Sequence, residues 1–221
     1  MRTYLNKALA YLPHTIVAII VVLIAVLGYQ HYATDRAIDR ARQAGEMAVL
    51  GNTQADITVV AYFDYNCPPC ATAGKALTQV LNNRRDIRVI VRPLGMLGKK
   101  SKKLAEFAIA AALQGKFQAY HSAFLDEMVR QAQGTKGQLE LGRTDALRVA
   151  RAAGLDTDRL QKMAESKRMK TIFERNTETA EQLGVQAIPT YIIGRRSYTP
   201  YYKTPKADDF QRMIDAVQGA S

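Results

Sequence analysis

Two cysteines, Cys67 and Cys70, are the residues whose type and spacing are best suited to chemistry in this chain. The sequence holds no other cysteine, and two thiols are too few for a four-ligand zinc site, so we expect no metal. A structural disulfide across such a short loop would constrain little of the unfolded chain. The spacing instead favours redox chemistry without a cofactor, in which one thiolate attacks a disulfide and the second thiol resolves the product.

The elements on either side of the cysteines must position them. Residues 56–63 are rich in β-branched and aromatic side chains, which predicts a buried strand, and residues 71–81 are predicted to be helical. Cys67 would then lie where a helix starts, and the free N–H groups and positive end of that helix favour a thiolate. We therefore predict Cys67 as the attacking residue and Cys70, about one turn later, as the resolving residue.

The two residues between the cysteines are Pro68 and Pro69, and neither has a backbone N–H. The sulfur of Cys67 can then accept hydrogen bonds only from later backbone groups, those of Cys70 and Ala71. We expect a thiolate that is less stabilised than in a site with donors at both intervening positions, and a centre that is less oxidising.

The rest of the chain alternates between strands and helices in a way that defines a fold. Residues 86–92 predict a second strand, parallel to the first because the connection between them contains a helix. A short strand follows Pro189, and residues 205–217 predict a terminal helix. Between the second strand and Pro189 we expect helices at 101–114, 117–129, 144–153, 157–165 and 167–183. The pattern predicts an α/β fold with a helical insertion at about residues 94–187.

Four short segments carry a resemblance to a known family. They are Phe-Asp-Tyr-Asn-Cys-Pro-Pro-Cys, the Arg-Pro-Leu-Gly after the second strand, Gln-Gly-Lys-Phe-Gln-Ala-Tyr-His and Gly-Val-Gln-Ala-Ile-Pro-Thr. With these segments the chain resembles the DsbA-like branch of the thioredoxin superfamily over about residues 49–217. The resemblance implies a thioredoxin-like core with a helical cap that oxidises, reduces or isomerises disulfides in other proteins.

The resemblance also implies a role for the segment Ile188, Pro189 and Thr190. In this family pattern a cis proline lies beside the cysteines and shapes a groove for substrate peptides. An ordinary proline at the start of a strand is the alternative, since prolines are common there. Together with the dithiol, we favour a cis bond before Pro189.

The sequence departs from the family pattern in its acidic residues. Family members usually carry a buried acid six positions before the first cysteine, thought to assist proton transfer from the second, and here that position is Ala61. Water or another residue must then do this work, or the exchange is slower. Asp64 lies closer to the cysteines and would oppose a thiolate if its carboxylate pointed inward.

The first part of the chain, residues 1–30, is predicted to be a membrane anchor. Residues 8–29 are mostly apolar, with the purest stretch at residues 16–27, and no clear cleavage site follows. We expect an uncleaved signal anchor that crosses a bacterial inner membrane once. A dithiol that acts on other proteins belongs on the oxidising side, so the domain is predicted in the periplasm.

Residues 31–49 are expected to connect this anchor to a thioredoxin-like domain at residues 50–221. Residues 32–49 predict a polar helix with a stripe of small side chains at Ala33, Ala37, Ala41, Ala44 and Ala48. The helix would be a stalk or, through the small residues, a self-association segment. The second possibility allows a homodimer, which an isomerase with two facing centres would need.

Charge and composition restrict the partners. The formal net charge is +11, but the basic residues are dispersed and no aromatic-rich basic stripe joins them, so we expect no nucleic-acid partner. The expected partners are exported proteins with thiols or disulfides and a membrane redox protein, either a quinone-linked oxidase or a thiol reductase. The alternative is a protein that binds or delivers a soft metal such as copper through the same cysteines.

Overall fold

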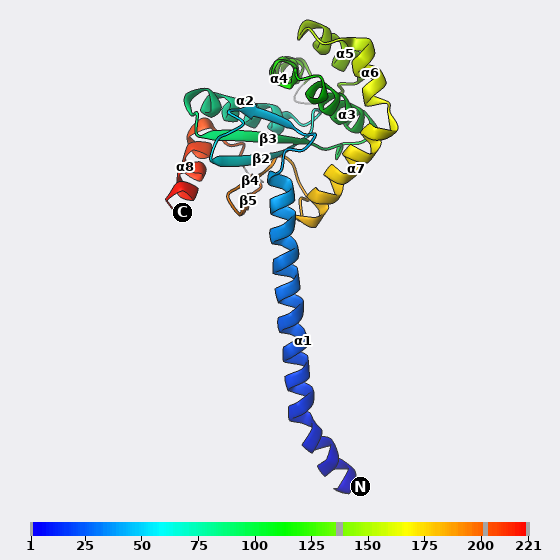
Figure 1. Cartoon of the computed structure of the whole chain (residues 1–221), viewed down its shortest axis with the longest axis vertical. Helices are drawn as coiled ribbons and strands as arrows, with labels where there is room; N and C mark the ends of the chain where they lie inside the picture. Colours follow the sequence, from blue (N-terminus) through cyan, green and yellow to red (C-terminus); the bar gives the residue numbers. More distant parts are fainter. Residues whose placement is uncertain (1, 136–138, 201–202, 220–221) are drawn as a thin grey trace.

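The structure is a computed structural model of the chain. It describes residues 2–135, 139–200 and 203–219, with the backbone alone for residues 2–15. Figure 1 shows a long N-terminal helix, α1 (Arg2–Arg42), that leads into a domain with a sheet and a group of helices beyond it.

A five-stranded mixed sheet forms the centre of the domain. In spatial order its strands are β1 (Ala48–Gly51), β3 (Ile87–Pro93), β2 (Ile57–Phe63), β4 (Thr190–Ile193) and β5 (Arg196–Tyr198). The strands β2 and β3 are parallel, as predicted, and every other neighbouring pair is antiparallel. The central strand β2 is apolar on both faces because both faces are covered.

The two faces of β2 support different layers. Ala61 and Phe63 belong to the main core, which they share with α2 (Pro68–Asn83) and α8 (Ala207–Gln218). Val60 and Tyr62 point to the opposite face and pack against residues of α1 and of the last helix of the insertion. The alternation follows from the period of two along a strand.

The predicted helical insertion lies between β3 and β4. Its helices are α3 (Lys99–Leu113), α4 (Phe117–Gly134), α5 (Arg143–Ala152), α6 (Thr157–Ala164) and α7 (Lys167–Gln182). In Figure 1 the helices α3 to α6 form a cap beside the sheet, and α7 runs back toward it. The fold is therefore the thioredoxin-like α/β fold with a helical insertion that the sequence predicted.

The prediction of one helix over residues 32–49 is wrong at its C-terminal end. Helix α1 stops at Arg42, and residues 48–51 form strand β1 at the edge of the sheet. Gly45 has a positive φ of 52°, which breaks the helix, and the apolar residues that follow pair with β3. The small residues Ala37 and Ala41 are buried within the same chain, so these two of the five alanines are not exposed for self-association.

Within the described residues, one helical segment, Ile16–Arg42, is long and apolar enough to cross a membrane, judged by length and composition. Its large apolar side chains from Ile16 to Leu27 are exposed. The same helix therefore has an apolar part that projects from the domain and a last part that belongs to it.

Arg92 of β3 fixes the end of α1 to the domain. The residue is 6% exposed, and its guanidinium donates hydrogen bonds of 2.9 Å to the carbonyl oxygens of Arg40, Ala41 and Gln43. It also donates to Oδ1 of Asn176 in α7. The last carbonyls of a helix have no partner within the helix, and a cation there is favourable. Arg92 thus caps α1 and joins it to both β3 and α7.

We predict that Arg92→Met weakens this junction. The variant removes the donor to three carbonyl groups, of which that of Ala41 is buried, and it also removes the hydrogen bond to Asn176, which together should lower the free energy of unfolding by about 2–4 kcal/mol. Thermal and urea unfolding of the full chain in detergent would measure the loss, and hydrogen exchange should speed up in the last turn of α1. As a control, Arg88→Met changes a half-exposed arginine of the same strand and should cost about 1 kcal/mol or less. Equal losses from the two variants would contradict this role.

Candidate active site: the Cys67–Cys70 pair

Cys67 is the N-cap residue of α2, directly after β2 and its short exit loop. Its sulfur accepts a hydrogen bond of 3.3 Å from the backbone N–H of Cys70, and Pro68 takes the first helical position. The N–H of Ala71, predicted as a second donor to the sulfur, instead bonds to the carbonyl oxygen of Cys67 at 3.2 Å. One backbone N–H therefore reaches the sulfur, where two were predicted, because the N–H of Ala71 takes part in the hydrogen bonding of the helix itself.

The two cysteines differ in access. Both are free thiols; Cys67 is 5% exposed and Cys70 is fully buried. The pair therefore has one sulfur that faces the surface and one beneath it, the order expected for an attacking and a resolving thiol. Among the described residues, no group of three or more His, Cys, Asp or Glu side chains is placed to hold a metal ion.

The local environment sets the two thiols apart chemically. The pKa of Cys67 is lowered, first by a hydrogen bond from the Cys70 thiol and also by the Cys70 N–H, although burial and the charge of Asp64 oppose the shift. The pKa of Cys70 is raised well above that of a free thiol because it is buried and its proton is shared with Cys67. At neutral pH the first sulfur is therefore favoured as the thiolate and the second as the thiol.

The peptide bond between Ile188 and Pro189 is cis, as predicted. The carbonyl oxygen of Ile188 lies 3.8 Å from the sulfur of Cys67, although the two residues are 121 positions apart in the sequence. Thr190 begins β4 and its hydroxyl bonds to the carbonyl of Ala187 at 2.7 Å. The structure thus brings together the cysteine pair and the three residues that sequence analysis assigned to the substrate groove.

Contacts with the helical insertion hold the loop that precedes Cys67. The side chain of Asn66 bonds to the backbone of Leu141 twice, at 3.0 Å and 2.8 Å. The hydroxyl of Tyr65 lies 2.9 Å from Nδ1 of His121, a fully buried imidazole in α4. Burial lowers the pKa of His121 to about 3, so this ring is neutral. Sequence analysis missed both contacts, because no pattern links residues this far apart.

Asp64 is fully buried, and its carboxylate does point into the protein. Oδ1 accepts the N–H of Asn66 at 2.8 Å, and Oδ2 accepts the N–H of Leu97 at 3.2 Å. The carbonyl oxygen of Asp64 accepts the N–H of Cys67 at 3.2 Å. Burial raises the pKa of the Asp64 carboxyl, although these backbone hydrogen bonds partly offset the effect.

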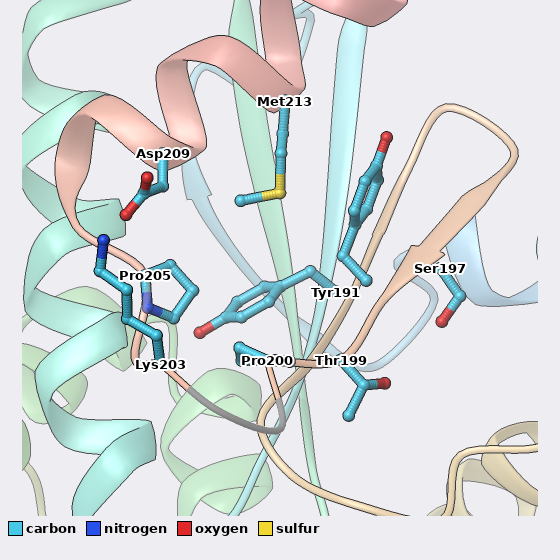
Figure 2. A pocket seen from close by; sticks show the side chains of 9 residues that line it. Tyr191, Ser197, Thr199, Pro200, Lys203, Pro205, Asp209 and Met213 are labelled. Atoms are coloured by element: carbon cyan, nitrogen blue, oxygen red, sulfur yellow. The ribbon is translucent and has the colours of Figure 1, made fainter.

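A pocket of about 470 Å³ lies between β4, β5 and α8 (Figure 2). Apolar groups of Tyr198, Pro200, Pro205 and Met213 form much of its wall. Tyr191 projects into it with its hydroxyl toward the side that Pro205 lines, and this buried hydroxyl has no hydrogen-bond partner. Burial raises the pKa of Tyr191 well above that of a free phenol, and negative charge on Cys70 or Cys67 raises it further, so Tyr191 lies within electrostatic range of the pair.

We predict that the thiol of Cys70 is the main support for the Cys67 thiolate. In Cys70→Ala the pKa of Cys67 should rise, because the strongest hydrogen bond to the sulfur is lost. Cys70→Ser, which keeps a hydroxyl donor, should retain more of the lowered value. The absorbance of the thiolate near 240 nm, followed against pH in the full chain, would measure both. A lower pKa in the alanine variant would contradict the arrangement.

Comparisons with known proteins agree with this geometry. A family model described as Thioredoxin matches residues 43–216. The structure of a thioredoxin-like oxidoreductase from Silicibacter pomeroyi is 30% identical, with a TM-score of 0.67, and the match covers 80% of this chain and 94% of that one. The thiol-disulfide exchange protein alpha-DsbA2 from Wolbachia pipientis is 20% identical, with a TM-score of 0.68 and coverage of 88% and 98%.

A curated relative is named as an antiporter and not as an oxidoreductase. The Na(+)/H(+) antiporter NhaA 3 of Salinispora tropica is 32% identical over 156 residues, which are 69% of this chain and 22% of that protein. The chain thus spans about a fifth of the length of the curated relatives it matches. The family model, in contrast, covers most of this chain and includes every residue of the site. On this evidence the chain belongs to the thioredoxin family, with the fold of its DsbA-like thiol–disulfide oxidoreductases.

Proposed function

We propose that this protein is a membrane-anchored periplasmic oxidoreductase that exchanges disulfides in exported proteins through Cys67 and Cys70. One observation carries the proposal: the surface-facing sulfur of Cys67 lies at the start of a helix, 3.8 Å from the carbonyl that precedes a cis proline. A lowered pKa gives this sulfur nucleophilic character at neutral pH. A cis proline is a specific feature of a fold and leaves the adjoining backbone free to pair with a substrate peptide.

The exchange has two steps that conserve electrons and protons. The Cys67 thiolate attacks one sulfur of a substrate disulfide, and the other sulfur leaves as a thiolate that takes up a proton. Cys70 then loses its proton and attacks the Cys67 sulfur, which releases the second substrate thiol. The cysteine pair ends as a disulfide, and the substrate has gained two electrons. The reverse sequence oxidises a dithiol substrate.

The surroundings of the pair suit an extended, partly apolar substrate. Ile188, Pro189 and Thr190 form one side of the proposed groove, and Tyr191, the next residue along β4, lines the pocket. Met96 and Leu97, 43% and 56% exposed, lie on the loop whose backbone bonds to Asp64, three residues before Cys67. Exposed apolar side chains at a site are typical of surfaces that bind proteins. Unfolded exported proteins, in which apolar residues are still exposed, are therefore the proposed substrates.

The anchor and its location are part of the proposal. Within α1, the segment Ile16–Arg42 is long and apolar enough for a single membrane span, judged by length and composition. Disulfide exchange on other proteins proceeds on the oxidising side of the membrane, so the domain is placed in the periplasm of a bacterium. A membrane redox protein, either a quinone-linked oxidase or a thiol reductase, would restore the pair after each cycle. The restricted donors to Cys67 favour a weakly oxidising centre, closer to a reductase or isomerase.

We predict that the full chain in detergent reduces the disulfides of insulin in the presence of a thiol reductant. Cys67→Ser should abolish this activity, because it removes the nucleophile, and Cys70→Ser should trap a mixed disulfide with the substrate. Turbidity of the insulin chains and mass measurement of the trapped adduct would test the two effects. Tight binding of Cu(I) by the wild-type chain without any disulfide reduction would instead favour the soft-metal alternative.

We predict that Met213→Lys weakens binding of protein substrates. The change places a charge in the apolar wall of the pocket, which should raise KM for a disulfide-bonded peptide with apolar flanks by about tenfold. The rate with a small aromatic disulfide should stay the same, since it needs no groove. Met163→Lys, at a half-buried methionine of α6, serves as the control for a general effect on stability. A similar KM in both variants would show that the pocket does not bind substrate.

A further inference from the structure

In the resolving step the thiol of Cys70 must lose its proton. Cys70 is fully buried and its pKa is raised, so it rests as a thiol, yet it must become a thiolate to attack Cys67. In the mixed disulfide the sulfur of Cys67 is already bonded twice and no longer offers a thiolate that could share the proton. A buried thiol beneath a bound substrate also has little contact with bulk water. Some nearby group of the protein has to accept the proton.

The groups around Cys70 can be compared by their chemistry. Tyr191 of β4 lies near both sulfurs, but burial keeps its phenol protonated. His121 of α4 stays neutral, and its pKa of about 3 makes it a very weak base. Ser101 of α3 lies beside the Asp64 carboxyl, and its hydroxyl is too weak a base to take the proton. Ala61, six positions before Cys67, has no group to offer.

Charged side chains of α3 are engaged elsewhere. Lys100 pairs with Glu140, and Lys103 pairs with Glu106 of the same helix. Lys102 lies over the ring of Phe173. These three lysine side chains therefore have partners other than the cysteine pair.

Asp64 remains, and its geometry suits the task. Its backbone donates a hydrogen bond toward the sulfur of Cys70, and its carbonyl accepts the N–H of Cys67. The carboxylate charge acts on both sulfurs. Oδ1 accepts the N–H of Asn66 and Oδ2 accepts the N–H of Leu97, and the backbone of Met96 and the hydroxyl of Ser101 also act on the carboxyl, which together fix its position. Because burial makes the carboxyl a stronger base than an exposed aspartate, it can take a proton more readily near neutral pH.

We propose that Asp64 accepts the proton of Cys70 in the resolving step, directly or through one water molecule. This inference rests on the proposed function and names the group that acts in a chain with alanine at position 61. The carboxylate takes the thiol proton while the Cys70 sulfur bonds to that of Cys67, and the substrate sulfur leaves with the electron pair of the broken bond. When the pair is reduced again, the carboxyl returns the proton to Cys70.

The two steps can be separated with an aromatic disulfide, 5,5′-dithiobis(2-nitrobenzoate), added to the reduced full chain in detergent. Attack by Cys67 releases one coloured thiolate, and attack by Cys70 releases a second. In Asp64→Asn the second phase should slow by about 100-fold at pH 7, since general-base assistance is commonly of this size or larger. The first phase should stay the same or become faster, because a negative charge near Cys67 is removed.

Asn66→Ala is the matched control. It breaks the contacts of the same loop with Leu141 but keeps the carboxylate, so the second phase should change by less than about threefold. The wild-type chain gives a second measurement that needs no variant. Its second-phase rate should rise with pH as Asp64 ionises and then level off, whereas in Asp64→Asn it should keep rising toward the pKa of Cys70.

The results separate this inference from the proposed function. A wild-type chain that releases no second thiolate has no working dithiol centre, and the proposed function fails. A wild-type chain with two phases, together with Asp64→Asn whose second phase is unchanged, overturns only the role of Asp64. Equal slowing of the second phase in Asp64→Asn and Asn66→Ala would also overturn it, because loop geometry would then explain the effect.

Discussion

One backbone N–H, that of Cys70, reaches the sulfur of Cys67, and the character of the site follows from this restriction. A cysteine at the start of a helix ordinarily faces several free N–H groups. Here Pro68 and Pro69 have no N–H, and the N–H of Ala71 bonds to the carbonyl oxygen of Cys67 within the helix. The thiol of Cys70 therefore becomes the strongest support of the thiolate. The nucleophile and the resolving group depend on each other more closely than in a site with ample donors.

The helical insertion does more than cover the cysteines. Three consecutive residues of the loop before Cys67 each bond to a different segment that follows β3. Asp64 bonds to Leu97 in the loop before α3, Tyr65 to His121 in α4, and Asn66 to Leu141 in the loop before α5. All three contacts are buried or nearly so, where a lost hydrogen bond is costly. The loop is thus held from outside the core sheet, which keeps the sulfur of Cys67 in line with the carbonyl before the cis proline.

Most of the fold could be predicted from the sequence because the patterns that specify its strands and helices are local. The strand at β2, the helix after Cys67 and the helices of the insertion follow from periodicity and from glycines at helix ends, and the cis bond at Pro189 follows from the family resemblance. The end of α1 was misjudged because a stripe of alanines suits both a free helix and a packed one, and tertiary contacts decided between them. The contacts of Asp64 and Tyr65 join distant segments, so no local pattern could predict them.

The end of β3 connects the anchor to the site. Arg92 caps α1, and only five residues later the N–H of Leu97 holds the carboxylate of Asp64. Helix α1 is continuous from its apolar part to this cap, and the distance along it from Leu27 to Arg42 is about 22 Å at 1.5 Å per residue. If α1 crosses a membrane as proposed, packing rather than a loose linker sets the height and direction of the cysteine pair. A membrane redox partner would then have to meet the site at a defined distance from the bilayer, while unfolded substrates could approach from any side.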